Sequence, residues 1–204
     1  MKKLILSAAA VFALTFANAQ EGEPTFGFSK GDFLIEGNIG FGSTNDKNTE
    51  TKTSNFNFNP KAGYFISDDL AIGLDLAFGS NKTEVSGTNT VENSFVGIGG
   101  FARYYFLDLG ARFKTYGEFG IGYMTVNNKI ADAKINTIGA GATLGINYFV
   151  TENFAINFAL ADILSYSSSK GDWSGAEAEN EFNFGFGQFN NFFSTAQFGL
   201  TFKF

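Results

Sequence analysis

The sequence predicts an all-β fold, an eight-stranded antiparallel up-and-down transmembrane β-barrel. Three observations predict it. Apolar side chains alternate with small or polar ones in eight successive segments. Long and short connections between these segments alternate along the chain. Charged residues make up only 17% of the 204 residues, below the roughly 25% typical of a soluble domain. A surface that lies largely in lipid accounts for all three observations.

The chain begins with the pattern of a secretory signal peptide over residues 1–19. Two lysines precede an apolar run over residues 4–16, and a small-residue cleavage site ends at Ala19, which would leave Gln20 as the mature N-terminus. The alternative is a transmembrane helix, but the run of about 13 residues is shorter than the roughly 20 that cross a bilayer. We therefore expect an exported protein.

The sequence predicts that the chain has three parts. They are the signal peptide at residues 1–19, a short N-terminal periplasmic segment at residues 20–30, and an outer-membrane β-barrel at residues 31–204. Cleavage removes two of the 14 Lys and Arg residues and none of the 20 Asp and Glu residues, so the net charge becomes −8. Because there is no Cys, neither a lipid-modified N-terminus nor a disulfide framework is available.

Each predicted strand has one apolar face. The strands are residues 33–42, 54–66, 70–79, 93–106, 113–126, 135–150, 154–162 and 196–204. The apolar positions are odd in the first and fifth strands and even in the others, while the opposite positions are mainly Gly, Ala, Asn and Thr. The seventh strand loses its alternation near Asp162, and the last runs to Phe204. Strands of about ten residues are long enough to span a membrane.

The connections predict a barrel with two different rims. Three connections are short, at residues 67–69, 107–112 and 151–153. Four are longer and polar, at residues 44–53, 80–92, 127–134 and 167–193. In an up-and-down barrel, alternate connections lie on the same side, so one rim has tight periplasmic turns and the other carries extracellular loops.

Three tyrosines predict an aromatic girdle at the periplasmic rim. Tyr64, Tyr104 and Tyr148 are outward-facing and each lies just before a short turn, twice within the near copies "YFISDDLAI" and "YFVTENFAI". A phenol ring suits the membrane–water interface because its body is apolar and its hydroxyl is polar. The simpler interpretation is that aromatic residues are good strand formers, but their fixed place beside the turns favours the girdle.

The strand charges distinguish this barrel from a soluble one, in which many Lys and Glu residues would occupy the polar face of the strands. The charged strand residues are few and sum to zero: Glu36, Lys61, Asp75, Arg103, Lys114, Glu118, Asp162 and Lys203. We predict a lumen charge network of Glu36, Lys61, Asp75, Arg103, Lys114 and Glu118. An eight-stranded interior is just filled by side chains, so this network is expected to plug the lumen rather than line an ion path.

Several motifs together resemble a known family. They are the secretory signal, the Gly-rich alternating strands, "FARYYF", the two "YF" turns and the ending "FGLTFKF". The chain resembles, over its whole mature length, the small outer-membrane β-barrel domain family, the OmpX- and OmpA-like porin-family barrels of Gram-negative bacteria. The resemblance implies that Phe202 and Phe204 form the signal read by the barrel-assembly machinery. The OmpA-like peptidoglycan-binding domain is expected to be absent.

The residue types argue against an enzyme. The chain has no His and no Cys, so the usual nucleophile–base pairs and transition-metal sites are missing. Inward carboxylates share their face with cations and fit structural ion pairs better than acids and bases. The acidic stretch at residues 171–181 lacks the ligand spacing of a calcium loop, and the glycines at residues 97–100 precede no helix. We expect no cofactor, no metal and no nucleic-acid partner.

The aromatic segment at residues 182–194 leaves several interpretations open. Parity with the last strand favours an outward extension of that strand, and the alternatives are an aromatic patch on the outer leaflet or a ligand or partner site in the last loop. The candidate loop interaction patch is Trp173, Phe184, Phe186, Phe189 and Phe192.

The function expected from these features is structural or interactive. A largely plugged barrel in the outer membrane would present its loops for adhesion, envelope integrity or recognition. Its expected partners are outer-membrane lipid, the assembly machinery and an extracellular ligand or host surface. The alternative is a narrow pore, or an OmpW-like transporter of small apolar molecules.

Overall fold

The computed structural model describes residues 25–185 and 197–204, so the predicted signal peptide lies outside the described residues. All strand pairs are antiparallel. The strands are β1 (Phe33–Asp46), β2 (Thr51–Phe65), β3 (Leu70–Val85), β4 (Thr88–Asp108), β5 (Phe113–Asn128), β6 (Ala133–Thr151), β7 (Phe154–Gly171), β8 (Glu179–Phe184) and β9 (Gln197–Lys203). Within the described part of the chain, no helix has the length and apolar character needed to cross a membrane.

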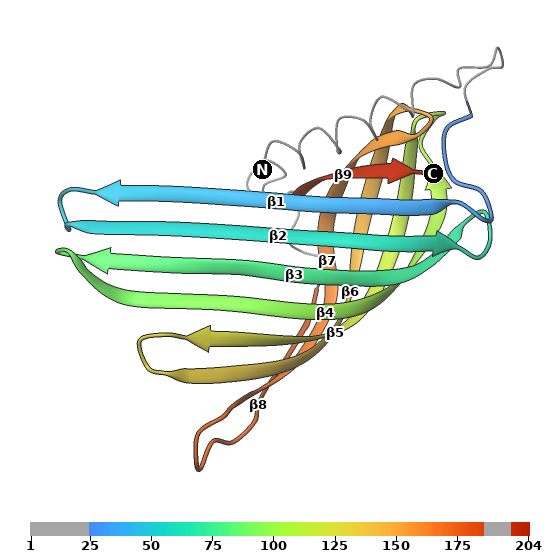
Figure 1. The fold of residues 1–204 in the computed structure, drawn as a ribbon. Helices are drawn as coiled ribbons and strands as arrows, with labels where there is room; N and C mark the ends of the chain where they lie inside the picture. Colours follow the sequence, from blue (N-terminus) through green and yellow to red (C-terminus); the bar gives the residue numbers. More distant parts are fainter. Residues whose placement is uncertain (1–24, 186–196) are drawn as a thin grey trace, which may run out of the picture.

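Eight of these strands close into a ring, which confirms the predicted fold. β1 through β7 pair in sequence order, and β9 closes the ring between β7 and β1 (Figure 1). Over the described residues, β9 pairs with β1 from Leu34 to Gly37. β8 lies on the same edge of β7 as β9 does, but further along, opposite Leu164–Ser169.

The predicted long connections are corrected by the structure, because most of their residues are strand. β1 and β2 pair as far as Asp46 and Thr51, and β3 and β4 pair as far as Val85 and Thr88. The apolar alternation stops where lipid contact ends, but polar residues continue to pair through their backbones. In Figure 1, β1 to β4 extend together well beyond the point where β9 closes the ring.

The tips of the first two hairpins on this side are joined to each other. Ser86 donates from its backbone N to the carbonyl oxygen of Glu50, at 3.0 Å, and from Oγ to the Glu50 carboxylate, at 2.6 Å. Both residues adopt a φ of 48°, the left-handed conformation that tight turns require. The outer parts of β1 to β4 therefore form one continuous sheet rather than separate flexible loops.

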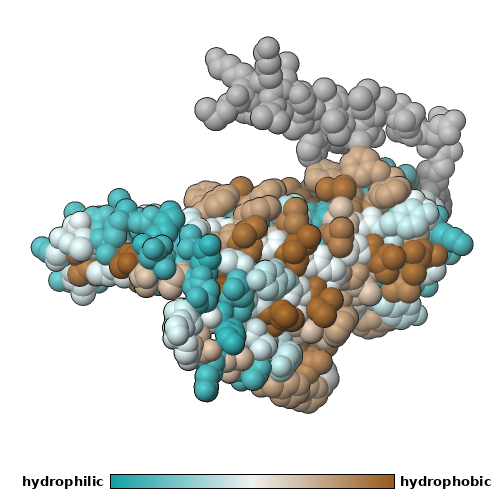
Figure 2. Space-filling view, turned by 60° about the horizontal axis from the view of Figure 1, so that its bottom comes forward, coloured by the Kyte–Doolittle hydropathy of each residue, from teal (hydrophilic) through white to brown (hydrophobic). Residues whose placement is uncertain are grey.

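The outward face of the strands carries the apolar residues. Large exposed apolar side chains occur all around the ring, among them Ile72, Leu74, Ile98, Phe119, Ile121 and Ile138. Figure 2 shows these apolar surfaces gathered in the middle and on one side of the molecule, with hydrophilic residues on the projecting hairpins. This is the distribution expected of a protein with lipid around its middle.

Aromatic residues line the rim that carries the short turns, in cross-strand pairs. The ring centroids of Phe33 and Tyr64 are 5.0 Å apart, and those of Phe113 and Tyr148 are 4.8 Å apart. Phe154 and Phe202 form a third pair, at 5.0 Å. Tyr104, on the same rim, lies opposite Leu70, and Phe204 is exposed at the end of the chain.

The seventh strand is irregular where the sequence indicated. The pairing of β6 with β7 shifts between Ala142 and Thr143 and again between Leu144 and Gly145. The shift turns Asp162 toward the lumen side, where it accepts a hydrogen bond from the Thr143 hydroxyl at 2.9 Å. Such bulges redirect side chains without ending the strand.

Candidate functional site

Two layers of side chains close the lumen near the rim that carries the short turns. The lower layer is built around Phe28, from the segment that precedes β1. Its ring stacks on Phe65 at 4.3 Å and lies 4.9 Å from Tyr105 and 5.2 Å from Phe149. These three residues are inward-facing and buried, so the aromatic plug formed by Phe28, Phe65, Tyr105 and Phe149 fills the mouth of the barrel.

Three hydrogen bonds, involving the end of β2, the β2–β3 turn and the end of β9, hold this N-terminal segment in place. Gly31 donates its N–H to the carbonyl oxygen of Phe65 at 2.9 Å, and Lys30 donates its N–H to the Asp68 carboxylate at 2.8 Å. The Lys203 ammonium donates to the carbonyl oxygen of Gly27, also at 2.9 Å. The predicted periplasmic segment therefore enters the barrel mouth over its described residues.

The upper layer is a buried ion cluster centred on Arg103 of β4. Its guanidinium binds both oxygens of Glu36 on β1, with Nη1–Oε2 and Nη2–Oε1 distances of 2.8 and 2.9 Å. Nε donates to Oε2 of Glu118 on β5 at 2.7 Å. The exposed fractions are 1% for Arg103, 4% for Glu36 and 11% for Glu118. A bidentate, charge-assisted geometry of this kind holds three strands in a fixed arrangement.

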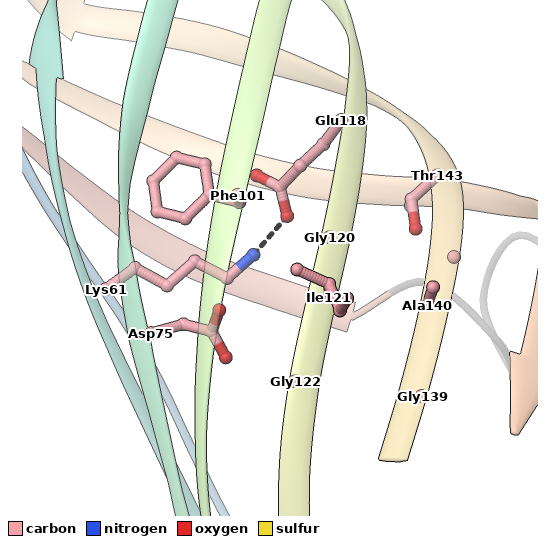
Figure 3. Close-up of a pocket in the computed structure, with 11 residues that line it drawn as sticks. Lys61, Asp75, Phe101, Glu118, Gly120, Ile121, Gly122, Gly139, Ala140 and Thr143 are labelled. Atoms are coloured by element: carbon pink, nitrogen blue, oxygen red, sulfur yellow. Dashed lines mark hydrogen bonds and ion pairs between the residues drawn. The ribbon is translucent and has the colours of Figure 1, made fainter. Parts of the chain in front are cut away.

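Lys61 extends the cluster and Lys114 does not. The Lys61 ammonium forms an ion pair with the other oxygen of Glu118, and Figure 3 shows Asp75 beside the Lys61 side chain. Lys114 was predicted to join this network, but it lies nearer the rim and pairs with Asp108 at 2.5 Å. Its place at the start of β5 puts it level with the periplasmic turn, below the layer that contains Arg103.

A buried polar group supports the cluster from the side of β6 and β7. The Asn157 amide donates to the Tyr116 hydroxyl and to Oδ1 of Asn147, both at 2.8 Å. The Tyr116 ring packs against the Arg103 guanidinium, 4.1 Å from ring centroid to Cζ. Gly145 makes this arrangement possible, because a Cβ there would overlap the end of the Tyr116 ring.

A cavity of about 650 Å³ lies against the ion cluster. Its ionisable lining residues are Glu36, Lys61, Asp75, Arg103, Glu118 and Asp162. Within residues 25–185 and 197–204, no three His, Cys, Asp or Glu side chains come close enough to hold a metal ion. The arrangement can therefore close the barrel and bind polar groups, and it offers no evident nucleophile with its base.

The candidate loop interaction patch is only partly described. Phe184 is exposed at the end of β8, opposite Leu164, whereas Trp173 lies in the β7–β8 hairpin. At about 3.3 Å per strand residue, the two side chains lie toward opposite ends of this hairpin and form no single patch. Phe186, Phe189 and Phe192 lie outside the described residues. β8 pairs with the outer part of β7, and Phe182 and Phe184 lie on the face that Leu164 and Tyr166 share. The rest of the predicted extension of the last strand, residues 186–194, lies outside the described residues.

Sequence reasoning missed the aromatic plug. A signal for it existed, since each girdle tyrosine is followed by an inward aromatic residue: Phe65 after Tyr64, Tyr105 after Tyr104 and Phe149 after Tyr148. Three inward aromatic side chains at one rim form an apolar surface inside the barrel, which another apolar side chain is expected to cover. Phe28 lies in a segment without periodicity, so nothing in its own surroundings indicated that it supplies this partner.

Comparison with known proteins agrees with the observed fold. The model of a protein family described as "Outer membrane protein beta-barrel domain" matches residues 6–204. The crystal structure of the outer membrane protein OprG from Pseudomonas aeruginosa is similar, with 17% identity, coverage of 87% of this chain and 98% of that one, and a TM-score of 0.53.

Two further solved structures align with lower scores. The N-terminal β-barrel domain of OprF from Pseudomonas aeruginosa has 17% identity, coverage of 86% and 98%, and a TM-score of 0.37. The Escherichia coli outer membrane protein W has 15% identity, coverage of 86% and 99%, and a TM-score of 0.44. No curated protein sequence matches the chain.

Proposed function

Because the chain belongs to the outer membrane protein β-barrel domain family, we propose that it is a structural and interaction protein of the bacterial outer membrane. In this proposal the barrel is closed and presents its outer hairpins for adhesion, envelope integrity or recognition. Its partners would be outer-membrane lipid around the strands and an extracellular ligand or host surface at the hairpins.

The observation that carries the proposal is the double closure of the lumen. The aromatic plug fills the periplasmic mouth, and the Glu36–Arg103–Glu118 cluster crosses the lumen next to it. A solute that crossed the barrel would have to displace four packed rings and separate a buried, bidentate ion pair. Both steps are costly in a low-dielectric interior, which favours a barrel that does not conduct.

The outer rim supports an interaction role. The paired outer parts of β1 to β4, joined at their tips by Ser86 and Glu50, form a rigid polar sheet that projects beyond the ring (Figures 1 and 2). A preformed surface loses less conformational entropy on binding than a flexible loop does.

Planar-bilayer conductance tests this function. The purified, refolded protein is expected to give no channels, with a general porin reconstituted in the same bilayers as the positive control. Reproducible single-channel steps from the unmodified protein would contradict a closed barrel and favour the narrow pore.

A second candidate function is the transport of small apolar molecules, as expected of an OmpW-like protein. It is favoured by the exposed Phe182 and Phe184, which face outward on β8. Replacing both by Ser should abolish uptake of an apolar fluorescent probe into cells that express the protein. Phe41→Ser serves as a matched control, because Phe41 is an exposed phenyl group on β1. Unchanged uptake in the double variant would exclude this route.

Export and assembly complete the proposal. We expect cleavage after Ala19, which the intact mass of the mature protein would show as a chain that begins at Gln20. Phe202 and Phe204 are proposed to be read by the barrel-assembly machinery, so Phe204→Ala should lower the folded fraction in cells. No enzymatic activity and no cofactor are proposed, because the sequence contains neither His nor Cys.

A further inference from the structure

The cavity beside the ion cluster has two carboxylates that the cluster does not neutralise. Within the cluster, Glu36 and Glu118 balance Arg103 and Lys61, and each member is ion-paired. The two remaining acidic residues that line the cavity are Asp75 and Asp162. The cavity therefore has a net charge of −2 when its carboxylates, its Lys and its Arg are ionised.

Neither of these carboxylates has a cation bound to it among the described residues. Asp162 accepts one hydrogen bond, from the Thr143 hydroxyl. Asp75 lies beside Lys61, but the Lys61 ammonium is directed to Glu118, as the dashed line in Figure 3 shows. Asp162 is exposed and Asp75 is half-buried, so both are accessible to a solute that enters the cavity.

The two carboxylates stand on opposite walls of the barrel. Asp75 belongs to β3 and Asp162 to β7, and in the ring of eight strands these two are four positions apart in either direction. A single metal ion needs several oxygen ligands within about 2.5 Å, and no such group of acidic residues occurs in the described part of the chain. A single molecule that neutralises both carboxylates must therefore be extended and carry a positive charge at each end.

The wall between the two carboxylates leaves room for such a molecule. A smaller hollow of about 250 Å³ is lined by Lys61, Asp75, Glu118 and Thr143, which also line the larger cavity. On β5 and β6 it is lined by Gly120, Gly122 and Gly139 (Figure 3), and Gly141 lines it as well. Without side chains there, the methylene groups of a linear molecule can lie against the backbone. The volume of the larger cavity falls within the range of small-molecule sites, about 300–1,000 Å³.

We propose that this cavity binds a small linear diamine or polyamine, with one ammonium group at Asp75 and another at Asp162. The inference rests on the proposed function in one respect, since the closed periplasmic end makes the lumen a binding cavity rather than a passage. Binding would be reached from the outer rim, where the inward-facing Asn55 and Asn81 are exposed. Ammonium–carboxylate pairs at accessible positions weaken with added salt, so affinity should fall as ionic strength rises.

Equilibrium dialysis with the protein in lipid nanodiscs tests this site, with radiolabelled putrescine as the probe. The unmodified protein should bind one putrescine per barrel in low salt. Asp75→Asn and Asp162→Asn should each weaken binding roughly three- to tenfold, as expected for loss of one partly screened ion pair. The double variant should abolish binding. Glu177→Gln is the matched control, because it removes an exposed carboxylate in the β7–β8 hairpin and should leave binding unchanged.

Three results would overturn the proposal. They are equal binding by the double variant and the unmodified protein, equal affinity for butylamine and putrescine, and displacement of putrescine by equimolar Mg²⁺. Gel mobility before and after boiling verifies that each variant is folded, and Asp162→Lys provides a second test at an exposed position if Asp75→Asn does not fold. Bilayer channels with intact putrescine binding would contradict the closed barrel alone, whereas lost binding without channels would contradict the diamine site alone.

Discussion

Arg103→Met should destabilise the barrel by an amount that reveals how the ion cluster works. The substitution removes a guanidinium that is 1% exposed and bonds two carboxylates, Glu36 and Glu118, themselves 4% and 11% exposed. Thr201 would remain as a donor to Glu36, and Lys61 as the cation for Glu118. Breaking a buried pair from one side costs about 3–5 kcal/mol, because a buried charge is left uncompensated.

The same argument predicts that removing the three charges together lowers the unfolding free energy less than removing Arg103 alone. In the combined variant Glu36→Gln, Arg103→Met and Glu118→Gln, no buried carboxylate is left without its cation, and Lys61 lies beside Asp75 (Figure 3). Replacing a whole buried ion cluster is often close to neutral. We therefore expect the triple variant to be more stable than Arg103→Met alone.

Urea unfolding in phospholipid vesicles, followed by the mobility of the folded form on unboiled gels, measures both variants. With a denaturant slope of about 2 kcal/mol/M, Arg103→Met should lower the urea midpoint by about 2 M. Lys129→Met is the control, because Lys129 forms an exposed pair with Glu92 at 3.0 Å, and it should leave the midpoint unchanged. The reasoning is refuted if the triple variant unfolds at the same or lower urea concentration than the single variant.

Three further predictions concern the aromatic plug, two lumen-facing glycines and the outer hairpins. Phe28→Ala removes ring contacts with Phe65 at 4.3 Å and with two other rings. Because Phe28 is only partly buried, the substitution should lower the unfolding free energy by about 2–3 kcal/mol in the same urea assay. An unchanged midpoint would show that the plug does not stabilise the barrel. Gly145→Ala should greatly reduce the folded fraction on gels because its Cβ overlaps Tyr116, whereas Gly139→Ala, with 3.5 Å to its nearest atom, should fold normally; equal yields would contradict this. In the outer part of β4, beyond the lipid-facing region, the hydrogen bond from Lys129 lowers the pKa of Glu92. Lys129→Met should therefore raise that pKa toward its usual value in a carboxyl NMR titration, and an unmoved pKa would exclude Lys129 as its cause.

The strand pattern could be predicted from sequence because lipid and lumen impose opposite requirements on alternate residues. The same logic placed Glu36, Lys61, Arg103 and Glu118 on one face, and the ring brings these four together. Which of these residues form ion pairs depends on the stagger between neighbouring strands. The alternation of apolar and polar residues does not reveal that stagger, and for that reason Lys114 was wrongly included in the lumen charge network.

The ends of the strands were harder to predict than their middles. Beyond the lipid, both faces of a strand meet water, so the apolar alternation that reveals a strand disappears while the backbone pairing continues. Residues such as Thr44 and Thr53 therefore resembled a loop in sequence, although they pair directly in the structure. The plug was missed for a related reason, since the rings that Phe28 contacts are far away in sequence.

The contact between Lys203 and Gly27 has a consequence for the order of assembly. These residues are 176 positions apart, and the backbones of Phe33 and Phe204 also exchange two hydrogen bonds of 2.9 Å. These contacts, at the start of β1 and in the segment that precedes it, can form only after β9 has been synthesised and has closed the ring. Contacts of such long sequence separation form late in folding. The bond between Lys203 and Gly27 thus reports that β9 is in place, and a chain without β9 would lose one of the bonds that hold the aromatic plug in the mouth of the barrel.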